Sequence, residues 1–264
     1  MSKAYPSNLS RAQYEFLSDL IPEAKPGGRP RDVEMWEVVN AIFYVLVEGV
    51  RWRALPGDFP AWQTVYTYFR NWRQDGTWLK IHDHLRAWTR IEQERHPTSP
   101  SSAFIDSQSV KSAALVHQSV GFDGGKLIKG RKRFLTVDTL GLVLRVLVTA
   151  ASVTEREGGK QVLKQVQQMG KRDTLLHTIW ADGGFDGEPF MQWVMDVCRW
   201  IVQVVVRPQQ TKGFVVLKKR WVVERTFGWF MGCRRLVRDY EGLPETSETF
   251  IYLAMIRIMV RRLA

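Results

Sequence analysis

Three acidic residues stand where a folded chain can bring carboxylates together. Asp106 lies at or near the end of the apolar run "AFIDS", and Asp182 directly follows a second apolar run, "LLHTIWA". Glu224 is the only acidic residue between Arg207 and Arg238, a stretch that contains nine basic residues. If the two runs are neighbouring strands, both aspartates project from one edge of a sheet, and a helix packed across that edge adds Glu224.

Such a trio suits metal-dependent chemistry on a phosphodiester. Mg²⁺ and Mn²⁺ prefer oxygen ligands, and three carboxylates repel one another unless a cation neutralises them. Two such ions can stabilise the entering and the leaving oxygen of an in-line phosphoryl transfer. The glycines after Asp182, Gly183 and Gly184, would keep the approach to the metals open.

Each acid also has an ordinary structural interpretation. An aspartate at a strand end often caps a turn, and a glutamate among arginines often serves only as an ion-pair partner. A serine nucleophile at Ser107 or Ser109 is disfavoured, because no histidine and aspartate follow at a recognisable spacing.

The charge balance points to a polyanionic partner. The 264 residues include 38 Lys and Arg against 27 Asp and Glu, which gives a net charge of +11. Residues 207–264 alone carry 12 basic and 5 acidic groups. Nucleic acid is the usual partner of such a chain, although a generically basic protein is the alternative.

Cysteine content and hydropathy favour a reduced, intracellular, soluble protein. Two cysteines, Cys198 and Cys233, cannot build a disulfide framework, and they lack the partners of a zinc site. The N-terminus has no apolar segment typical of a signal peptide. The longest apolar run, "FIYLAMIRIMV", contains Arg257 and is too short to span a bilayer.

Hydrophobic periodicity divides the chain into a helical part and a mixed part. Residues 1–95 read as a helical N-terminal domain, 96–102 as a linker rich in Pro and Ser, and 103–264 as a domain of strands and helices. Short turns between the first three strands predict antiparallel pairing, and helices between the later ones predict parallel crossovers. The expected fold class is α/β, a mixed sheet with flanking helices preceded by a small helical domain. The strands are expected at 103–107, 132–139, 142–150, 175–181 and 200–206, and the helices at 10–21, 32–52, 61–76, 77–94, 157–170, 188–198, 220–241 and 247–263.

Three segments together resemble the signature regions of insertion-sequence DDE transposases, in the group named after insertion sequence 5. They are "FIDSQSVKSA", "WADGGFDGEPF" and "KRWVVERTFGWFMGCRRLVRDYE", and the likeness extends over nearly the whole chain. It implies a ribonuclease-H-like catalytic domain in which Asp106, Asp182 and Glu224 form the catalytic triad. It also implies two Mg²⁺ ions per site (Mn²⁺ as a substitute) and a cytoplasmic, nucleoid-associated bacterial protein.

The reaction implied by the resemblance is DNA transposition. Water attacks a phosphodiester at the transposon end, and the freed 3′-hydroxyl then attacks target DNA. A metal-dependent nuclease without strand transfer, and an inactive transposase-derived DNA-binding regulator, are the alternatives. The match departs from the family signature around the glutamate: Arg220 fits, but Leu217 occupies the tyrosine position and Met231 the basic position, with Arg234 and Arg235 nearby.

Further basic residues are expected to contact DNA. The cluster "KGRKR" either contacts phosphates near the active site or lies on a solvated edge strand, where lysines discourage sheet pairing. The N-terminal domain, by resemblance, recognises terminal inverted repeats, with dimerisation as its alternative role. Its third helix offers Gln63, Thr64 and Thr67 with its aromatics turned inward. Because transposition joins two element ends, a homodimer or higher oligomer on DNA is expected. The expected DNA-binding residues are Lys129, Arg131, Lys132, Arg133, Arg220, Arg225, Arg234, Arg235, Arg70 and Arg73.

Overall fold

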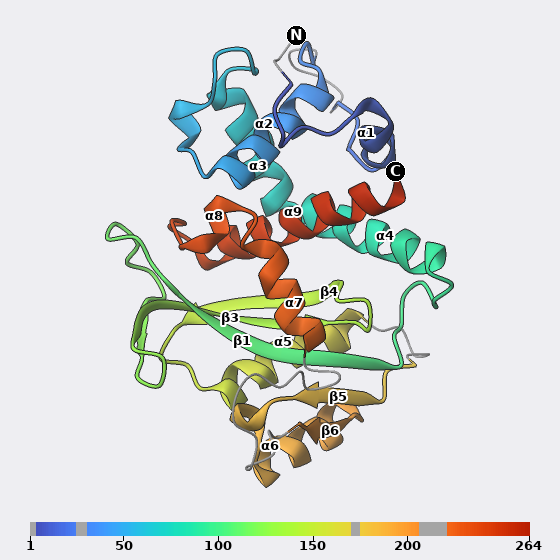
Figure 1. Ribbon diagram of the computed structural model, residues 1–264, viewed down its shortest axis with the longest axis vertical. Helices are drawn as coiled ribbons and strands as arrows, with labels where there is room; N and C mark the ends of the chain where they lie inside the picture. Colours follow the sequence, from blue (N-terminus) through green and yellow to red (C-terminus); the bar gives the residue numbers. More distant parts are fainter. Residues whose placement is uncertain (1–3, 25–30, 170–174, 206–220) are drawn as a thin grey trace.

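A computed structural model describes residues 4–24, 31–169, 175–205 and 221–264 of the chain (Figure 1). Its upper part in Figure 1 is helical, and its lower part is a curved sheet with helices on both faces. The N-terminal helices lie close to where they were predicted, and Ser10 caps the first of them in a capping box with Gln13. These helices are α1 (Arg11–Ser18), α2 (Met35–Glu48), α3 (Trp62–Gln74) and α4 (Thr77–Glu92), with a 3₁₀ turn, η1 (Trp52–Ala54), between α2 and α3.

The sheet confirms the predicted mixture of antiparallel and parallel strands. Its strand order is β4-β3-β1-β5-β6, and the short β2 extends it by pairing with the start of β3. Pairing of β1 with β3 and of β3 with β4 is antiparallel, whereas β1–β5 and β5–β6 are parallel. The sequence did not predict β2, because three residues are too few to show an alternating pattern. The strands are β1 (Ser102–Lys111), β2 (Gly121–Asp123), β3 (Ile128–Val137), β4 (Val143–Ala150), β5 (Thr178–Ala181) and β6 (Ile201–Val204).

The helices after β4 include one correction. A single helix over 220–241 was predicted, but the described chain leaves the helix at Phe230 and resumes one only at Arg234. Gly228 and Gly232 are weak helix formers, and the backbone closes three-residue turns there before Cys233 becomes extended. These later elements are α5 (Glu155–Met169), η2 (Gly183–Phe185), α6 (Glu188–Trp193), the π-helical turn η3 (Val194–Cys198), α7 (Trp221–Phe230), α8 (Arg234–Val237) and α9 (Pro244–Leu263).

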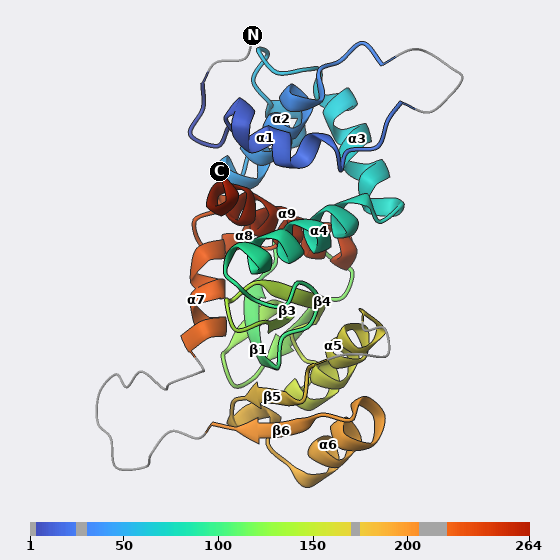
Figure 2. The same ribbon diagram turned by 90° about the vertical axis from the view of Figure 1, so that its right-hand side faces the viewer.

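Two hydrophobic cores lie on opposite faces of the sheet. In Figure 2, α7 lies on one side of the strands and α5 on the other. The core on the α5 face joins Ala103 and Ile105 of β1 to α5, β5 and α6. Gly158 of α5 lets this helix approach closely, since a Cβ there would lie 2.2 Å from the Phe134 ring.

The second core is shared between the N-terminal helices and the C-terminal part of the chain. It runs from Leu17 of α1 through α2, α3 and α4 to Phe104 of β1, Phe227 of α7 and Met255 of α9. Helix α9 lies between the N-terminal helices and the sheet (Figure 1), so the N-terminal helices share one hydrophobic core with the C-terminal part of the chain. The domain boundary at 96–102 stays a prediction. None of the described helices is both long enough and apolar enough to cross a membrane.

Glu248 of α9 makes stability depend on pH. Its carboxylate accepts a 2.9 Å hydrogen bond from the Val148 amide of β4. Burial raises the pKa of Glu248 to about 7; the hydrogen bond opposes this rise and Glu245 adds to it. The folded chain thus keeps a proton that the unfolded chain has released, so the free energy of unfolding falls as pH rises from the unfolded pKa to the folded one.

We expect Glu248→Gln to remove this loss, because the amide keeps an acceptor for Val148 but carries no charge. Relative to wild type, the variant should gain on the order of 3 kcal/mol between roughly pH 4.5 and pH 8. Urea unfolding followed by circular dichroism at both pH values measures the gain. Glu157→Gln, at an exposed position that does not contribute to the pKa of Glu248, is the matched control and should follow the wild type. Parallel pH dependence of wild type and Glu248→Gln would contradict the assignment.

Candidate active site

The ladder between β1 and β5 brings Asp106 and Asp182 to the same level of the sheet. Their parallel register pairs Ser102 with Thr178 and Phe104 with Trp180, an offset of 76 residues that also separates Asp106 from Asp182. Each aspartate follows the Phe104–Trp180 pair by two residues. Neighbouring strands lie about 4.8 Å apart, so the two aspartates lie on adjacent chain segments. Asp106 does not end its strand as expected but lies within β1, whereas Asp182 directly follows β5.

The same face of the sheet carries the helix with Glu224. Phe104 and Trp180 pack into the core shared with α7, and strand alternation directs Asp106 and Asp182 to that side. Helix α7 packs on β1 and β3, and it lies across β1 in Figure 1. Its buried side includes Val223 and Phe227, while Glu224, in the first turn, is exposed. All three predicted acids thus belong to one side of the sheet.

Backbone amides orient both aspartates. The Ser107 amide donates to Asp106 Oδ1 at 2.7 Å, and the Gly184 amide donates to Asp182 Oδ1 at 2.9 Å. A Cβ on Gly184 would lie 3.1 Å from Asp182 Oδ1 and 3.0 Å from Glu155 Cγ, whereas one on Gly183 would meet nothing within 4 Å. Of the two glycines, Gly184 is therefore the one whose missing side chain matters to the fold around Asp182.

A charged network lies beside the two aspartates, and no local pattern in the sequence predicts it. Lys132 Nζ lies 3.0 Å from Glu155 Oε1 and 3.5 Å from Asp123 Oδ2. Ser107 Oγ donates to Glu155 at 3.2 Å, and Ser109 Oγ donates to Asp123 at 2.5 Å. Both serines are thus occupied by carboxylates rather than by a histidine, which agrees with the rejection of a serine nucleophile. The members come from β1, β2, β3 and α5, so only the assembled sheet reveals them.

The acids have the donor chemistry that a hard divalent cation requires. Carboxylate oxygens are the ligands that suit Mg²⁺ and Mn²⁺. Within the described ranges, no three His, Cys, Asp or Glu side chains are grouped closely enough to hold a metal ion. The ligand set Asp106, Asp182 and Glu224 therefore stays a prediction, supported by the shared level and face.

The cluster "KGRKR" requires a correction. Strand β3 is internal, paired on both sides, and the side chains of Arg131, Lys132 and Arg133 are buried. Arg131 forms an ion pair with Asp239 at 3.1 Å, Lys132 belongs to the network above, and Arg133 donates to the Leu236 carbonyl at 2.7 Å. Burial also lowers the pKa of Arg133 to about 10. These three side chains hold the protein together instead of contacting phosphates, and only Lys129 is exposed.

The predicted basic residues after β6 separate into buried and accessible ones. Arg235 is buried, donates to Glu241 at 2.6 Å, and is likewise a correction to the expected DNA contacts. Arg225 stacks between Trp221 and Trp229, with its guanidinium 4.3 Å and 4.8 Å from their ring centroids. Arg234 is exposed. Met231 is exposed too, and Leu217 and Arg220 lie outside the described residues.

Helix α3 differs partly from the expected recognition helix. Arg70 is exposed and Arg73 half-buried, as DNA contacts require, and Phe69 is buried as expected. Tyr66, however, is 37% exposed, so not every aromatic ring turns inward.

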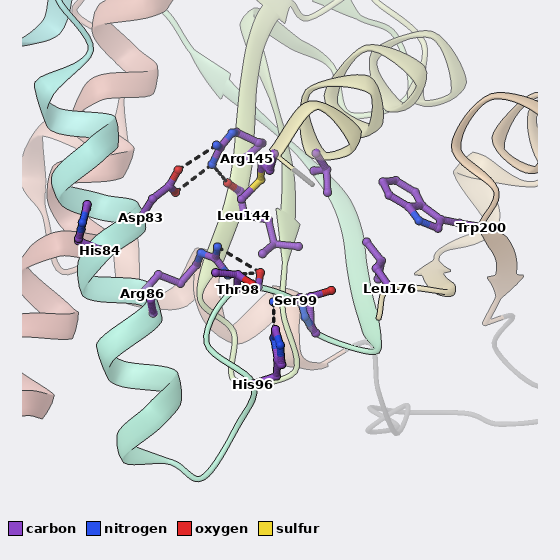
Figure 3. Close-up of a pocket in the computed structure, with 14 residues that line it drawn as sticks. Asp83, His84, Arg86, His96, Thr98, Ser99, Leu144, Arg145, Leu176 and Trp200 are labelled. Atoms are coloured by element: carbon purple, nitrogen blue, oxygen red, sulfur yellow. Dashed lines mark hydrogen bonds and ion pairs between the residues drawn. The ribbon is translucent and has the colours of Figure 1, made fainter. Parts of the chain in front are cut away.

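A cavity of about 590 Å³ lies between α4, β4 and α5, and none of the three acids lines it (Figure 3). The Asp83 carboxylate pairs with the Arg145 guanidinium at 2.9 Å on one wall. Burial opposes ionisation of Asp83, but the His82 hydrogen bond and Arg145 outweigh it and hold the pKa well below its usual value. Arg86 reaches the Thr98 carbonyl at 3.4 Å. These bonds fasten the expected linker to α4, and α4 to β4.

Comparison with known proteins places the chain in one family. Residues 82–259, about two thirds of the chain, match the family described as "Transposase DDE domain". Residues 9–82 match a family described as "Putative transposase of IS4/5 family". The two matches meet inside α4.

Two proteins of Burkholderia cepacia are similar to parts of the chain. A "Putative transposase for insertion sequence element IS402" is 28% identical over 128 residues, covering 47% of this chain and 60% of the relative. An "Insertion element IS402 uncharacterized 16.2 kDa protein" is 30% identical over 106 residues, covering 37% of this chain and 69% of the relative. With the DDE-domain match over about two thirds of its length and a mixed sheet flanked by helices, the chain belongs to the family of DDE-domain transposases of insertion sequences.

Proposed function

We propose that the protein is a DNA transposase that cuts phosphodiester bonds at the ends of a mobile element. It then joins the freed 3′-hydroxyl to target DNA. The observation that supports the proposal is the β1–β5 register, which pairs Phe104 with Trp180, two residues before Asp106 and Asp182 respectively. Helix α7 on the same face supplies Glu224 as the third acid.

The cofactor proposed is a pair of Mg²⁺ ions, for which Mn²⁺ can substitute, held by Asp106, Asp182 and Glu224. When bound, such ions offset the negative charge that develops on the phosphate and lower the pKa of an attacking water. The donor chemistry fits, because the set consists of carboxylates alone and its members are half-buried (Asp106 and Asp182) or exposed (Glu224).

The chain's own residues hold these acids in place. The amides of Ser107 and Gly184 orient the two aspartates. Glu155 of α5 pairs with Lys132 of β3 and accepts a hydrogen bond from Ser107 of β1, which ties both strands to α5 beside Asp106. Lys129 and Arg234 are the exposed cations from the predicted set that remain available for phosphates around the catalytic domain.

The partners proposed are the terminal inverted repeats of the element, target DNA, and a second copy of the chain. The N-terminal helices carry the end recognition through Arg70 and Arg73 of α3. Because α9 packs against both these helices and the sheet, DNA bound to α3 is held in a fixed orientation relative to the catalytic edge.

Incubation of the purified chain with Mg²⁺ and a labelled duplex carrying the element's ends tests the proposal. Wild-type protein should release the element end, and with target plasmid present it should yield joined products. Asp182→Ala should do neither. Cleavage without joined products would favour the nuclease alternative, and equal cleavage by Asp182→Ala would exclude this carboxylate from the reaction.

A further inference from the structure

A second pocket, of about 540 Å³, lies between α3, η1 and the segment that joins α8 to α9. Its volume falls in the range of about 300–1,000 Å³ that small-molecule sites occupy. Tyr66, Arg70 and Arg73 line it from successive turns of α3, and Arg53 of η1 and the preceding Arg51 line it from the other side. Among these, only Arg70 and Arg73 were singled out by the sequence.

Aromatic rings form the walls of this pocket. Trp52 meets Tyr66 edge-on, with ring centroids 5.4 Å apart, and packs against buried Phe69 at 4.9 Å. Trp62, which also lines the pocket, has the Arg53 guanidinium 5.5 Å from its ring centroid. Tyr66 keeps 37% of its surface exposed. A planar ring of a ligand can therefore stack on these aromatic side chains.

The charge of the pocket is strongly positive. Arg235 and Glu241 lie on its floor and neutralise each other through a 2.6 Å hydrogen-bonded pair. In the part of the chain that the structure describes, no carboxylate pairs with Arg51, Arg53, Arg70 or Arg73. Four uncompensated guanidinium groups around one opening repel one another, and an anion relieves that repulsion.

Stacking rings beside unpaired guanidinium groups favour one class of ligand, a nucleotide outside a duplex. In a duplex the faces of the bases are already stacked, so a concave aromatic pocket can take only a base that has left the stack. Proteins that bind single strands combine aromatic platforms with cationic grooves in this way.

We propose that this pocket binds an unpaired nucleotide of the DNA substrate, with its base against Trp52, Trp62 and Tyr66. The flanking phosphates contact Arg51, Arg53, Arg70 and Arg73. The proposal rests on DNA being the substrate, and it deepens that function by assigning unpaired nucleotides to the helical region.

Fluorescence anisotropy on the full chain in EDTA tests it without cleavage. The probes are a fluorescein-labelled oligothymidylate, an abasic oligonucleotide of equal length and charge, and the corresponding duplex. Wild-type protein should bind the oligothymidylate about tenfold more tightly than the abasic strand, because stacking of a base contributes that much. Equal binding of the two strands would overturn the proposal and leave only a phosphate patch.

Variants separate stacking from charge. Tyr66→Ala should lose the preference for the base while binding the abasic strand as before, and Tyr66→Phe should keep the preference. If Tyr66→Ala does not fold, Tyr66→Leu replaces it in the test. This variant retains apolar bulk and should likewise lose the preference for the base. Arg70→Gln should weaken both strands and lower the salt slope by about 0.7, whereas Arg95→Gln, at an exposed position outside the pocket, should change neither. Retention of the base preference by both Tyr66→Ala and Tyr66→Leu would contradict the assignment.

The two proposals fail separately. A chain that keeps the base preference but does not cleave element ends would contradict the transposase proposal and retain the pocket proposal. A chain that cleaves element ends but shows no base preference would contradict the pocket proposal and retain the transposase proposal.

Discussion

Asp106→Asn should lower DNA cleavage by at least about 10³-fold while the fold is retained. The side chains have nearly the same shape, and the amide keeps an oxygen that can accept the Ser107 amide hydrogen bond. What is lost is the negative charge beside Asp182, at the level that the β1–β5 register sets. A cation then has only one of its two strand-borne carboxylates.

Single-turnover cleavage of labelled end duplexes in Mg²⁺ measures the effect, with circular dichroism as the check on folding. Asp186→Asn is the matched control, because it removes the same charge from an exposed position four residues after Asp182. It should retain most of the wild-type rate. If Asp106→Asn and Asp186→Asn cleave alike, general negative charge at this edge is all that matters, and the paired-carboxylate site is wrong.

The acids stand out as candidates because their signals are local. Each aspartate follows an apolar run, and Glu224 is the only acid in a basic stretch, but their joint role as metal ligands stays a prediction. The parallel pairing of β1 and β5 also follows from the order of strands and helices. Only the structure gives the register of that pairing, whose offset of 76 residues puts Asp106 level with Asp182.

What could not be predicted depends on contacts between distant segments. "KGRKR" reads as a basic patch, but Arg131 finds its acidic partner, Asp239, 108 residues later in the sequence. Tyr66 follows an apolar helix pattern, yet η1 and the α8–α9 segment leave a cavity in front of it. The local sequence pattern indicates how polar a side chain is. Only the folded structure shows whether another segment of the chain covers that side chain.

Arg131→Met should lower the free energy of unfolding by about 3–5 kcal/mol, because it leaves a buried carboxylate without its cation. The Arg131 side chain is fully buried, and it donates to Asp239 Oδ1 at 3.1 Å and to Ser247 Oγ at 3.2 Å. It also donates to the carbonyls of Gln118, Glu241 and Gly242, at 2.8–3.2 Å. One guanidinium thus joins β3 to the loop after β1 and to the segment before α9.

Urea unfolding of the full chain measures this loss, and two comparisons identify its cause. Arg131→Lys keeps the charge but cannot reach all of these acceptors, so it should also be destabilised. Lys129→Ala, at an exposed position two residues earlier, should change the free energy of unfolding by less than about 0.5 kcal/mol. Were Arg131 a phosphate contact, Arg131→Lys would bind DNA more weakly at unchanged stability.

Because Asp239 is the group left uncompensated, adding Asp239→Asn to Arg131→Met should recover part of the loss in the free energy of unfolding. No recovery would show that packing of the arginine stem, not its charge, stabilises this junction.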